Sequence, residues 1–201
     1  MEKTRLGKTG LRVTRTAFGA LPIQRIGFDD AAKLLRKAYD AGINYFDTAR
    51  VYTDSEEKIG RAFEGIDRGS YILSSKTMSE DRDGVLRDIE TSLGFLKTDY
   101  IDLLQLHTPD TLPNPDDANS SYAALLQAKE QGMIRHIGIT NHKIGVAREA
   151  VKSRLYESLQ FPFSYLATEK EVEMVNLCRT RGVGFIAMKA LSGGLAANIP
   201  A

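Results

Sequence analysis

The stretch GINYFDTARVYTDSEEKIGRAF, residues 42–63, contains one unit of the expected fold. NYFDTA (44–49) is apolar and aromatic like a buried strand, and DSEEKIGRAFEG (54–65) has the apolar spacing of a helix. The same alternation continues in both directions along the chain. The strand-like stretches are 14–20, 44–49, 71–77, 101–107, 136–142, 158–164 and 183–190. Uninterrupted alternation of strands and helices predicts βαβ units and a parallel sheet.

The helix-like stretches carry recognisable start and stop signals. In FDDAAKLLRKAYDAG (28–42) we expect Asp29 or Asp30 to cap the N-terminus and Gly42 to end the helix. The other helix-like stretches are 54–65, 83–96, 120–132, 143–153 and 168–182.

Both an open doubly wound sheet and a closed barrel fit this alternation. The strand-like stretches recur about every 28 residues, and seven of them are more than most open sheets of this length carry. The first strand-to-helix turn, GALPIQRIG (19–27), lacks the glycine pattern of a dinucleotide-binding open sheet. Several strand-like stretches also end in polar residues, as at the active-site face of a (β/α)8 barrel. We therefore favour the barrel.

The chain is expected to form a single domain over residues 1–201, because no linker-like segment divides it. The seventh repeat breaks off in GGLAANIPA (193–201), so we expect a barrel that is truncated before its eighth repeat. The apolar first and last strands would then have free edges. We expect these edges to be covered by a longer natural protein or by a second copy in a homo-oligomer.

The composition is that of a globular enzyme rather than of a nucleic-acid or membrane protein. Of the 201 residues, 42% are hydrophobic and 26% are charged, and the net charge is +1. This balance offers no general attraction for nucleic acid or for an acidic membrane. The lone Cys178 excludes an intramolecular disulfide and a multi-cysteine metal site, and no metal is expected. No signal peptide or membrane span is apparent, so we expect a cytoplasmic protein.

Four polar residues lie at or just after the ends of three consecutive strand-like stretches. Asp47 ends the second, and Tyr52 follows in the next loop. Lys76 ends the third stretch and His107 the fourth. Each residue alone has an ordinary structural explanation, such as a cap, a surface aromatic ring or a hydrogen-bonded core histidine. Because neighbouring parallel strands end at one rim, the four together indicate a site.

These four groups are suited to protonating a carbonyl as hydride reaches its carbon. A phenol has an ordinary pKa of about 10, and a nearby ammonium favours its ionised form. We therefore expect Lys76 to lower the pKa of Tyr52, and Asp47 to hold Lys76 in place. The imidazole of His107 can hydrogen-bond a carbonyl oxygen and orient it.

The run 42–63 resembles the signature of the aldo-keto reductase family, in which the aspartate and the tyrosine are catalytic. Other segments similar to that family are LGKTGLRV (6–13), SSKT (74–77), DLLQLH (102–107), HIGITN (136–141) and LQFPFSY (159–165). The resemblance extends from about residue 3 to residue 195 and implies the family's (β/α)8 barrel, with an N-terminal β-hairpin closing its bottom. It also implies that Asp47, Tyr52, Lys76 and His107 form the catalytic tetrad.

The same resemblance implies a nicotinamide cofactor, NADP being more frequent in the family and NAD also used. Thr140, in place of the family's serine, would bind the nicotinamide amide together with Asn141 and Gln160. Met188 stands where a tyrosine commonly stacks on the ring. The segment around Met188 resembles a bacterial branch that often carries a C-terminal ferredoxin-like extension. The region that grips the cofactor's adenosine phosphate in the family falls beyond the seventh repeat.

The expected function is reduction of an aldehyde or ketone with hydride from NAD(P)H, with Tyr52 as proton donor. The expected partner is therefore a small carbonyl substrate. A nucleotide-sensing regulatory protein, such as the potassium-channel β-subunits that share the scaffold, is the alternative from another class. An inactive truncated fragment is the third.

Overall fold

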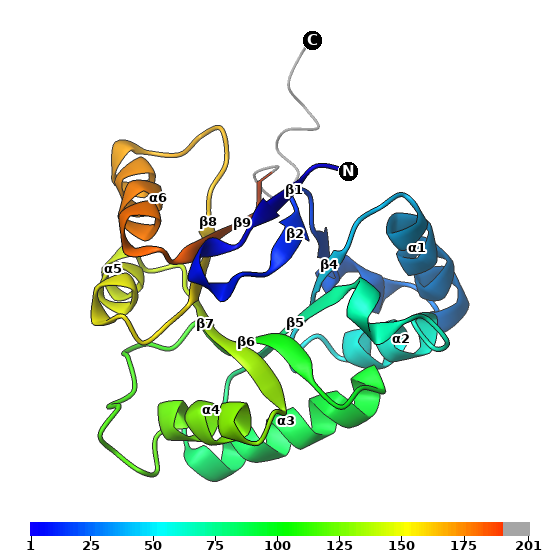
Figure 1. Ribbon diagram of the computed structural model, residues 1–201, viewed down its shortest axis with the longest axis horizontal. Helices are drawn as coiled ribbons and strands as arrows, with labels where there is room; N and C mark the ends of the chain where they lie inside the picture. Colours follow the sequence, from blue (N-terminus) through cyan, green and yellow to red (C-terminus); the bar gives the residue numbers. More distant parts are fainter. Residues whose placement is uncertain (191–201) are drawn as a thin grey trace.

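Seven parallel strands curl into an incomplete barrel in the computed structural model, which describes residues 1–190 (Figure 1). The strands are β3 (Phe18–Gly19), β4 (Tyr45–Asp47), β5 (Ile72–Thr77), β6 (Ile101–His107), β7 (Ile134–Thr140), β8 (Ser158–Pro162) and β9 (Gly184–Met188). Each strand pairs with the next one in the sequence, so β3 and β9 form the two edges. This confirms the predicted α/β barrel with about seven units. The segment 193–201 lies outside the described residues.

Helices follow the strands and cover the outside of the sheet (Figure 1). They are α1 (Phe28–Asp40), α2 (Ser55–Ala62), α3 (Arg82–Leu96), α4 (Ser121–Glu130), α5 (Ile144–Ser153) and α6 (Glu169–Arg181). The predicted cap of α1 was wrong, because Gly27 occupies the N-cap. Asp29 and Asp30 lie within the first turn instead, where carboxylates interact favourably with the helix dipole. Gly42 has a φ of 93° just after this helix, which explains the glycine there.

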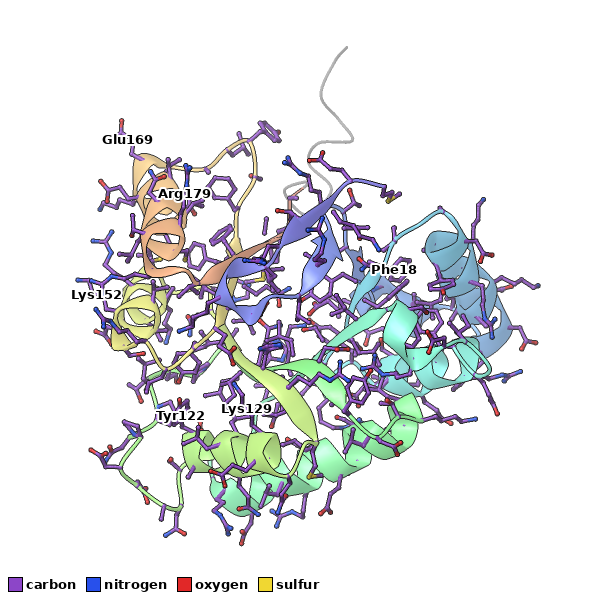
Figure 2. The ribbon with its side chains drawn as sticks, viewed as in Figure 1. Phe18, Tyr122, Lys129, Lys152, Glu169 and Arg179 are labelled. Atoms are coloured by element: carbon purple, nitrogen blue, oxygen red, sulfur yellow. The ribbon has the colours of Figure 1, made fainter. Side chains whose placement is uncertain are left out.

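Helix α6 packs on the barrel through two apolar residues that are spaced four apart. Met174 and Cys178 are fully buried against the barrel. Glu169 and Arg179 of α6, like Lys152 of α5, are exposed (Figure 2). The helical spacing of its apolar residues thus fixes which side of α6 packs on the sheet.

An antiparallel hairpin of β1 (Lys3–Arg5) and β2 (Arg12–Thr14) lies at the N-terminal end of the barrel. Leu6 and Val13 of this hairpin region pack against barrel residues, including Leu103. The resemblance thus placed a hairpin correctly. The predicted first strand, 14–20, was too long, because Thr14 pairs with Lys3 in the hairpin and the barrel strand keeps only two residues.

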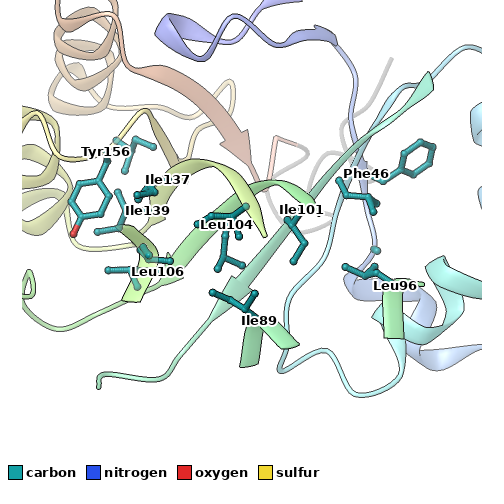
Figure 3. Packing of buried hydrophobic residues seen from close by; sticks show 14 of the residues in the cluster. Phe46, Ile89, Leu96, Ile101, Leu104, Leu106, Ile137, Ile139 and Tyr156 are labelled. Atoms are coloured by element: carbon teal, nitrogen blue, oxygen red, sulfur yellow. The ribbon is translucent and has the colours of Figure 1, made fainter. Parts of the chain in front are cut away.

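The apolar core lies between the sheet and its helices. Strand β6 has side chains on both faces, some in this core and some in the barrel interior. Leu104 and Leu106 belong to the large apolar cluster that packs under the helices (Figure 3). Gln105 hydrogen-bonds across the barrel interior. Since side chains alternate along a strand, His107 continues the inward-facing series and reaches the barrel mouth.

Gly60 allows α2 to contact the C-terminal end of α3 closely. A Cβ atom at this position would lie 2.1 Å from the carbonyl oxygen of Phe95, which is too close for any side chain. We expect Gly60→Ala to lower the free energy of unfolding by about 2 kcal/mol, because backbone must move to relieve the clash. Gly94→Ala is the matched control, since nothing lies within 4 Å of its Cβ position. Urea unfolding of both variants tests this, and equal stabilities would contradict it.

Candidate active site

Seven of the eight candidate residues surround one cavity of about 520 Å³ at the C-terminal ends of the strands. They are Asp47, Tyr52, Lys76, His107, Thr140, Gln160 and Met188. The eighth, Asn141, does not line it. Its amide nitrogen donates to the carbonyl of Pro109 at 2.8 Å, and its amide oxygen accepts from the backbone of Lys143 at 2.7 Å. Asn141 therefore joins two loops beside the cavity, and its expected contact with the nicotinamide stays a prediction.

Lys76 and Asp47 form a buried ion pair in the wall of this cavity. The Lys76 Nζ lies 2.7 Å from Asp47 Oδ2, and it also donates to the carbonyl oxygen of Thr48. Only 2% of the Lys76 side chain and 10% of the Asp47 side chain are exposed. A buried charge needs such partners, so each residue holds the other in place.

Tyr52 lies beside the ion pair but does not share the lysine's hydrogen bonds. The Lys76 Nζ is 5.4 Å from the centre of the Tyr52 ring. Burial, and secondarily the negative charge of Asp47, raise the pKa of the Tyr52 phenol to about 12. This differs from the expected lowering by Lys76, because the effect of burial dominates and two of the three ammonium hydrogens are donated to Asp47 and Thr48. At neutral pH the phenol therefore keeps its proton.

The imidazole ring of His107 packs edge-to-face with the Tyr52 ring in the cavity. Their rings are 5.9 Å apart between centroids and stand at 81° in a T-shaped arrangement. His107 Nδ1 is buried and has no hydrogen-bond partner within residues 1–190. Burial, together with the positive charge of Lys76, lowers the pKa of His107 to about 4. The ring is thus a neutral imidazole above that pH.

We expect His107 to titrate near pH 4 in the folded chain, well below the ordinary value of about 6.5. Between these two values the unfolded chain binds more protons than the folded one, so the unfolding free energy falls as the pH is lowered through this window. Ring nitrogen NMR can follow the chain's three histidines. His107→Gln assigns the signal and should remove part of the loss of stability at low pH. A His107 midpoint above pH 6 would contradict this.

Thr140 and Gln160 lie at the cavity's inner side. The Thr140 hydroxyl makes no hydrogen bond to any residue that the structure describes, so it remains free for a ligand. The Gln160 amide nitrogen donates to Asp47 Oδ2 at 3.2 Å, and its oxygen accepts from Gln105 at 3.0 Å. Gln160 keeps one amide hydrogen for another acceptor.

Two polar residues that position the site were missed in the sequence. Gln105 is fully buried, and its amide nitrogen also donates to Ser74 Oγ at 3.0 Å. The sequence did contain a signal for Gln105, because a side chain two residues before His107 points to the same face of the strand. Glu56 lies in the first turn of α2. It is only 1% exposed and accepts hydrogen bonds from Ser75 and Ser92.

The backbone is strained next to three of the candidate residues. In each case a non-glycine residue with a positive φ immediately follows the candidate. These pairs are Tyr52–Thr53, His107–Thr108 and Met188–Lys189, with φ values of 42°, 55° and 56° at the second residue. The two other positive-φ residues outside glycine among residues 1–190, Lys97 and Arg154, are helix C-caps, where this conformation is common. Strain concentrated in this way is typical of functional sites.

Comparison with known proteins relates this geometry to a family. A family model described as "Aldo/keto reductase family" matches residues 16–198. An uncharacterized oxidoreductase, YrpG of Bacillus subtilis, is 31% identical over 227 residues, covering 97% of this chain and 68% of the relative. The L-galactose dehydrogenase of Arabidopsis thaliana is 28% identical over 215 residues, covering 97% and 67%.

Among solved structures, the holo form of aldo-keto reductase AKR11C1 from Bacillus halodurans superposes with a TM-score of 0.88. It is 27% identical, and the match covers 100% of this chain and 70% of that one. The chain spans about two thirds of the length of the curated relatives it matches. Within the described residues, no helix has both the length and the apolar character needed to cross a membrane.

Proposed function

We propose that this chain, which belongs to the aldo/keto reductase family, exchanges hydride between a nicotinamide cofactor and a small carbonyl compound. The reaction would be reduction of an aldehyde or ketone to an alcohol, or its reverse. One observation carries this proposal: the Lys76–Asp47 ion pair, the Tyr52 phenol and the neutral His107 line a single cavity.

The cavity fits a nicotinamide group. Its wall is partly apolar through Ile186 and Met188, which suits a ring face. The Thr140 hydroxyl, which has no partner within residues 1–190, and the spare amide hydrogen of Gln160 suit the carboxamide. NADP is the proposed cofactor, with NAD as the alternative. When bound in reduced form, it would supply the hydride.

Residues of this chain would supply the proton for the reaction. Tyr52 keeps its phenolic hydrogen at neutral pH, because its pKa lies near 12, and would donate it to the developing alkoxide. His107, neutral for the same pH range, would donate a hydrogen bond that orients the carbonyl oxygen. Lys76, held by Asp47, would keep the carboxylate beside Tyr52 paired with a cation while the proton leaves.

The proposal is tested by incubating the chain with NADPH or NADH and a panel of small aldehydes, and following the loss of absorbance at 340 nm. We expect carbonyl-dependent oxidation of at least one cofactor. Fluorescence titration measures cofactor affinity separately. A chain that binds cofactor tightly and reduces no carbonyl would instead support a nucleotide-sensing function. A chain that does neither would refute both functions.

A further inference from the structure

We propose that a cavity at the N-terminal end of the barrel binds a soluble anion of phosphate size that carries two negative charges. Inorganic phosphate and phosphomonoesters belong to this class. The cavity lies at the end of the strands opposite the candidate active site. The inference therefore goes beyond the proposed function and does not depend on carbonyl reduction.

The cavity has a volume of about 570 Å³ and lies where strands β4 to β7 begin. The hairpin contributes Lys3 of β1 and Arg12 of β2 to its lining. The starts of the barrel strands contribute Ile72, Asp102 and Arg135. A phosphate group fills only part of this volume, so the cavity also has room for a small organic group attached to it.

Positive charge exceeds negative charge around this cavity. Lys3 and Arg12 make no ion pair and no side-chain hydrogen bond to any residue that the structure describes. Asp102 is the only carboxylate in the described lining, and it already pairs with Arg68 at 2.6 Å. Arg135 shares this same carboxylate at 3.4 Å. One negative charge therefore faces four positive ones, and an anion in the cavity would meet a net attraction.

The hairpin places two of its cations in an unfavourable position. Arg12 lies directly opposite Arg5 in the register of β1 and β2, and both residues are exposed. Like charges directly opposite each other destabilise a strand pair. Within residues 1–190, no carboxylate pairs with either arginine. A bound anion beside Arg12 would relieve this repulsion.

The groups that would contact the anion are held in place before it binds. The guanidinium carbon of Arg135 lies 3.6 Å from the centre of the Tyr100 ring. Asn44 fixes the hairpin strand, because its side chain donates to the carbonyl of Arg12 at 2.9 Å and accepts from the backbone of Thr14 at 2.7 Å. Guanidinium groups can bind two oxygens of a phosphate at once, and groups already in place lose less entropy on binding.

The proposal is tested by titrating the chain with inorganic phosphate, followed by backbone amide NMR at constant ionic strength and about pH 8, where phosphate carries close to two charges. We expect saturable shifts at Lys3, Arg12, Gly69 and Arg135, all of which line the cavity. Nitrate, an anion with one charge, should bind about tenfold more weakly.

Variants show whether these cations bind the phosphate. Arg12→Gln should weaken phosphate binding by at least about fivefold, because one charge-assisted contact is lost. Arg12→Lys keeps the charge and should recover part of this loss. Arg87→Gln is the matched control and should leave the affinity unchanged. Arg87 is an exposed arginine of α3 whose side chain has no ion pair in the described part of the chain.

Three results would overturn the proposal. Equal shifts with nitrate and phosphate would mean that salt merely screens the charges. An unchanged phosphate affinity in Arg12→Gln would place the bound anion elsewhere. Sedimentation of the chain with vesicles that contain phosphatidic acid, without saturable binding of free phosphate, would assign these cations to a lipid surface instead of a soluble anion.

Discussion

Replacement of Tyr52 by phenylalanine is expected to reduce carbonyl turnover by at least ~100-fold, the usual scale for loss of a general acid. The substitution removes the phenolic oxygen and keeps the ring that packs against His107. The Tyr52 phenol keeps its proton at neutral pH, and its ring lies 5.4 Å from the Lys76 Nζ and 5.9 Å from the His107 ring. Cofactor affinity should change little, because the phenol is not among the groups proposed to bind the nicotinamide.

Steady-state kinetics and a fluorescence titration of cofactor binding measure the two effects separately. Tyr165→Phe makes the same chemical change at a tyrosine that is 60% exposed, and it should leave both quantities unaltered. Near-normal turnover in Tyr52→Phe would show that another group donates the proton. A loss of cofactor affinity equal to the loss of turnover would point to a binding role for the phenol.

The alternation of strands and helices could be predicted because each buried parallel strand is a short apolar run and each covering helix has one apolar face. The weakest point was the start of the barrel. Residues 14–20 read as one strand, but Thr14 pairs in the hairpin, while only Phe18 and Gly19 pair with β4. Sequence pattern cannot separate these two short segments, since it contains no information about the pairing partner.

The strand-end residues could also be predicted to lie together, because parallel strands deliver their C-terminal ends to one rim. The sequence did not predict which partners the buried polar groups would hydrogen-bond. Asn141 adjoins the site in the sequence, yet its amide joins two loops. Glu56 occupies a first helical turn, where capping is the common role, yet the packing of α2 against β5 and α3 buries it. Both outcomes depend on contacts between segments that are distant in the sequence.

Lys76 shows that the choice of hydrogen-bond partners changes the acid–base chemistry of the site. The sequence suggested that its ammonium would lower the pKa of Tyr52. Its hydrogen bonds go to Asp47 and Thr48, and the pKa of the phenol is raised instead. The lysine's larger contribution in this geometry is to neutralise a carboxylate that would otherwise be buried without a charged partner.

Lys76→Met is therefore expected to lower the free energy of unfolding by about 3 kcal/mol at pH 7, because it leaves the Asp47 carboxylate buried without its cation. Hydrogen bonds from Gln105 and Gln160 remain for Asp47, so the loss should fall at the lower end of the range for broken buried pairs. Methionine keeps the length and apolar stem of the lysine. Urea unfolding followed by circular dichroism gives the change.

The double variant Asp47→Asn/Lys76→Met is the decisive control, since it removes both charges while keeping the side-chain volumes. It should recover at least half of the stability lost by Lys76→Met, because the penalty arises from the unpaired charge rather than from lost packing. A double variant as unstable as the sum of the two single variants would mean that the pair contributes through packing alone. A single variant within about 1 kcal/mol of the original chain would mean that water or another group reaches Asp47 in solution.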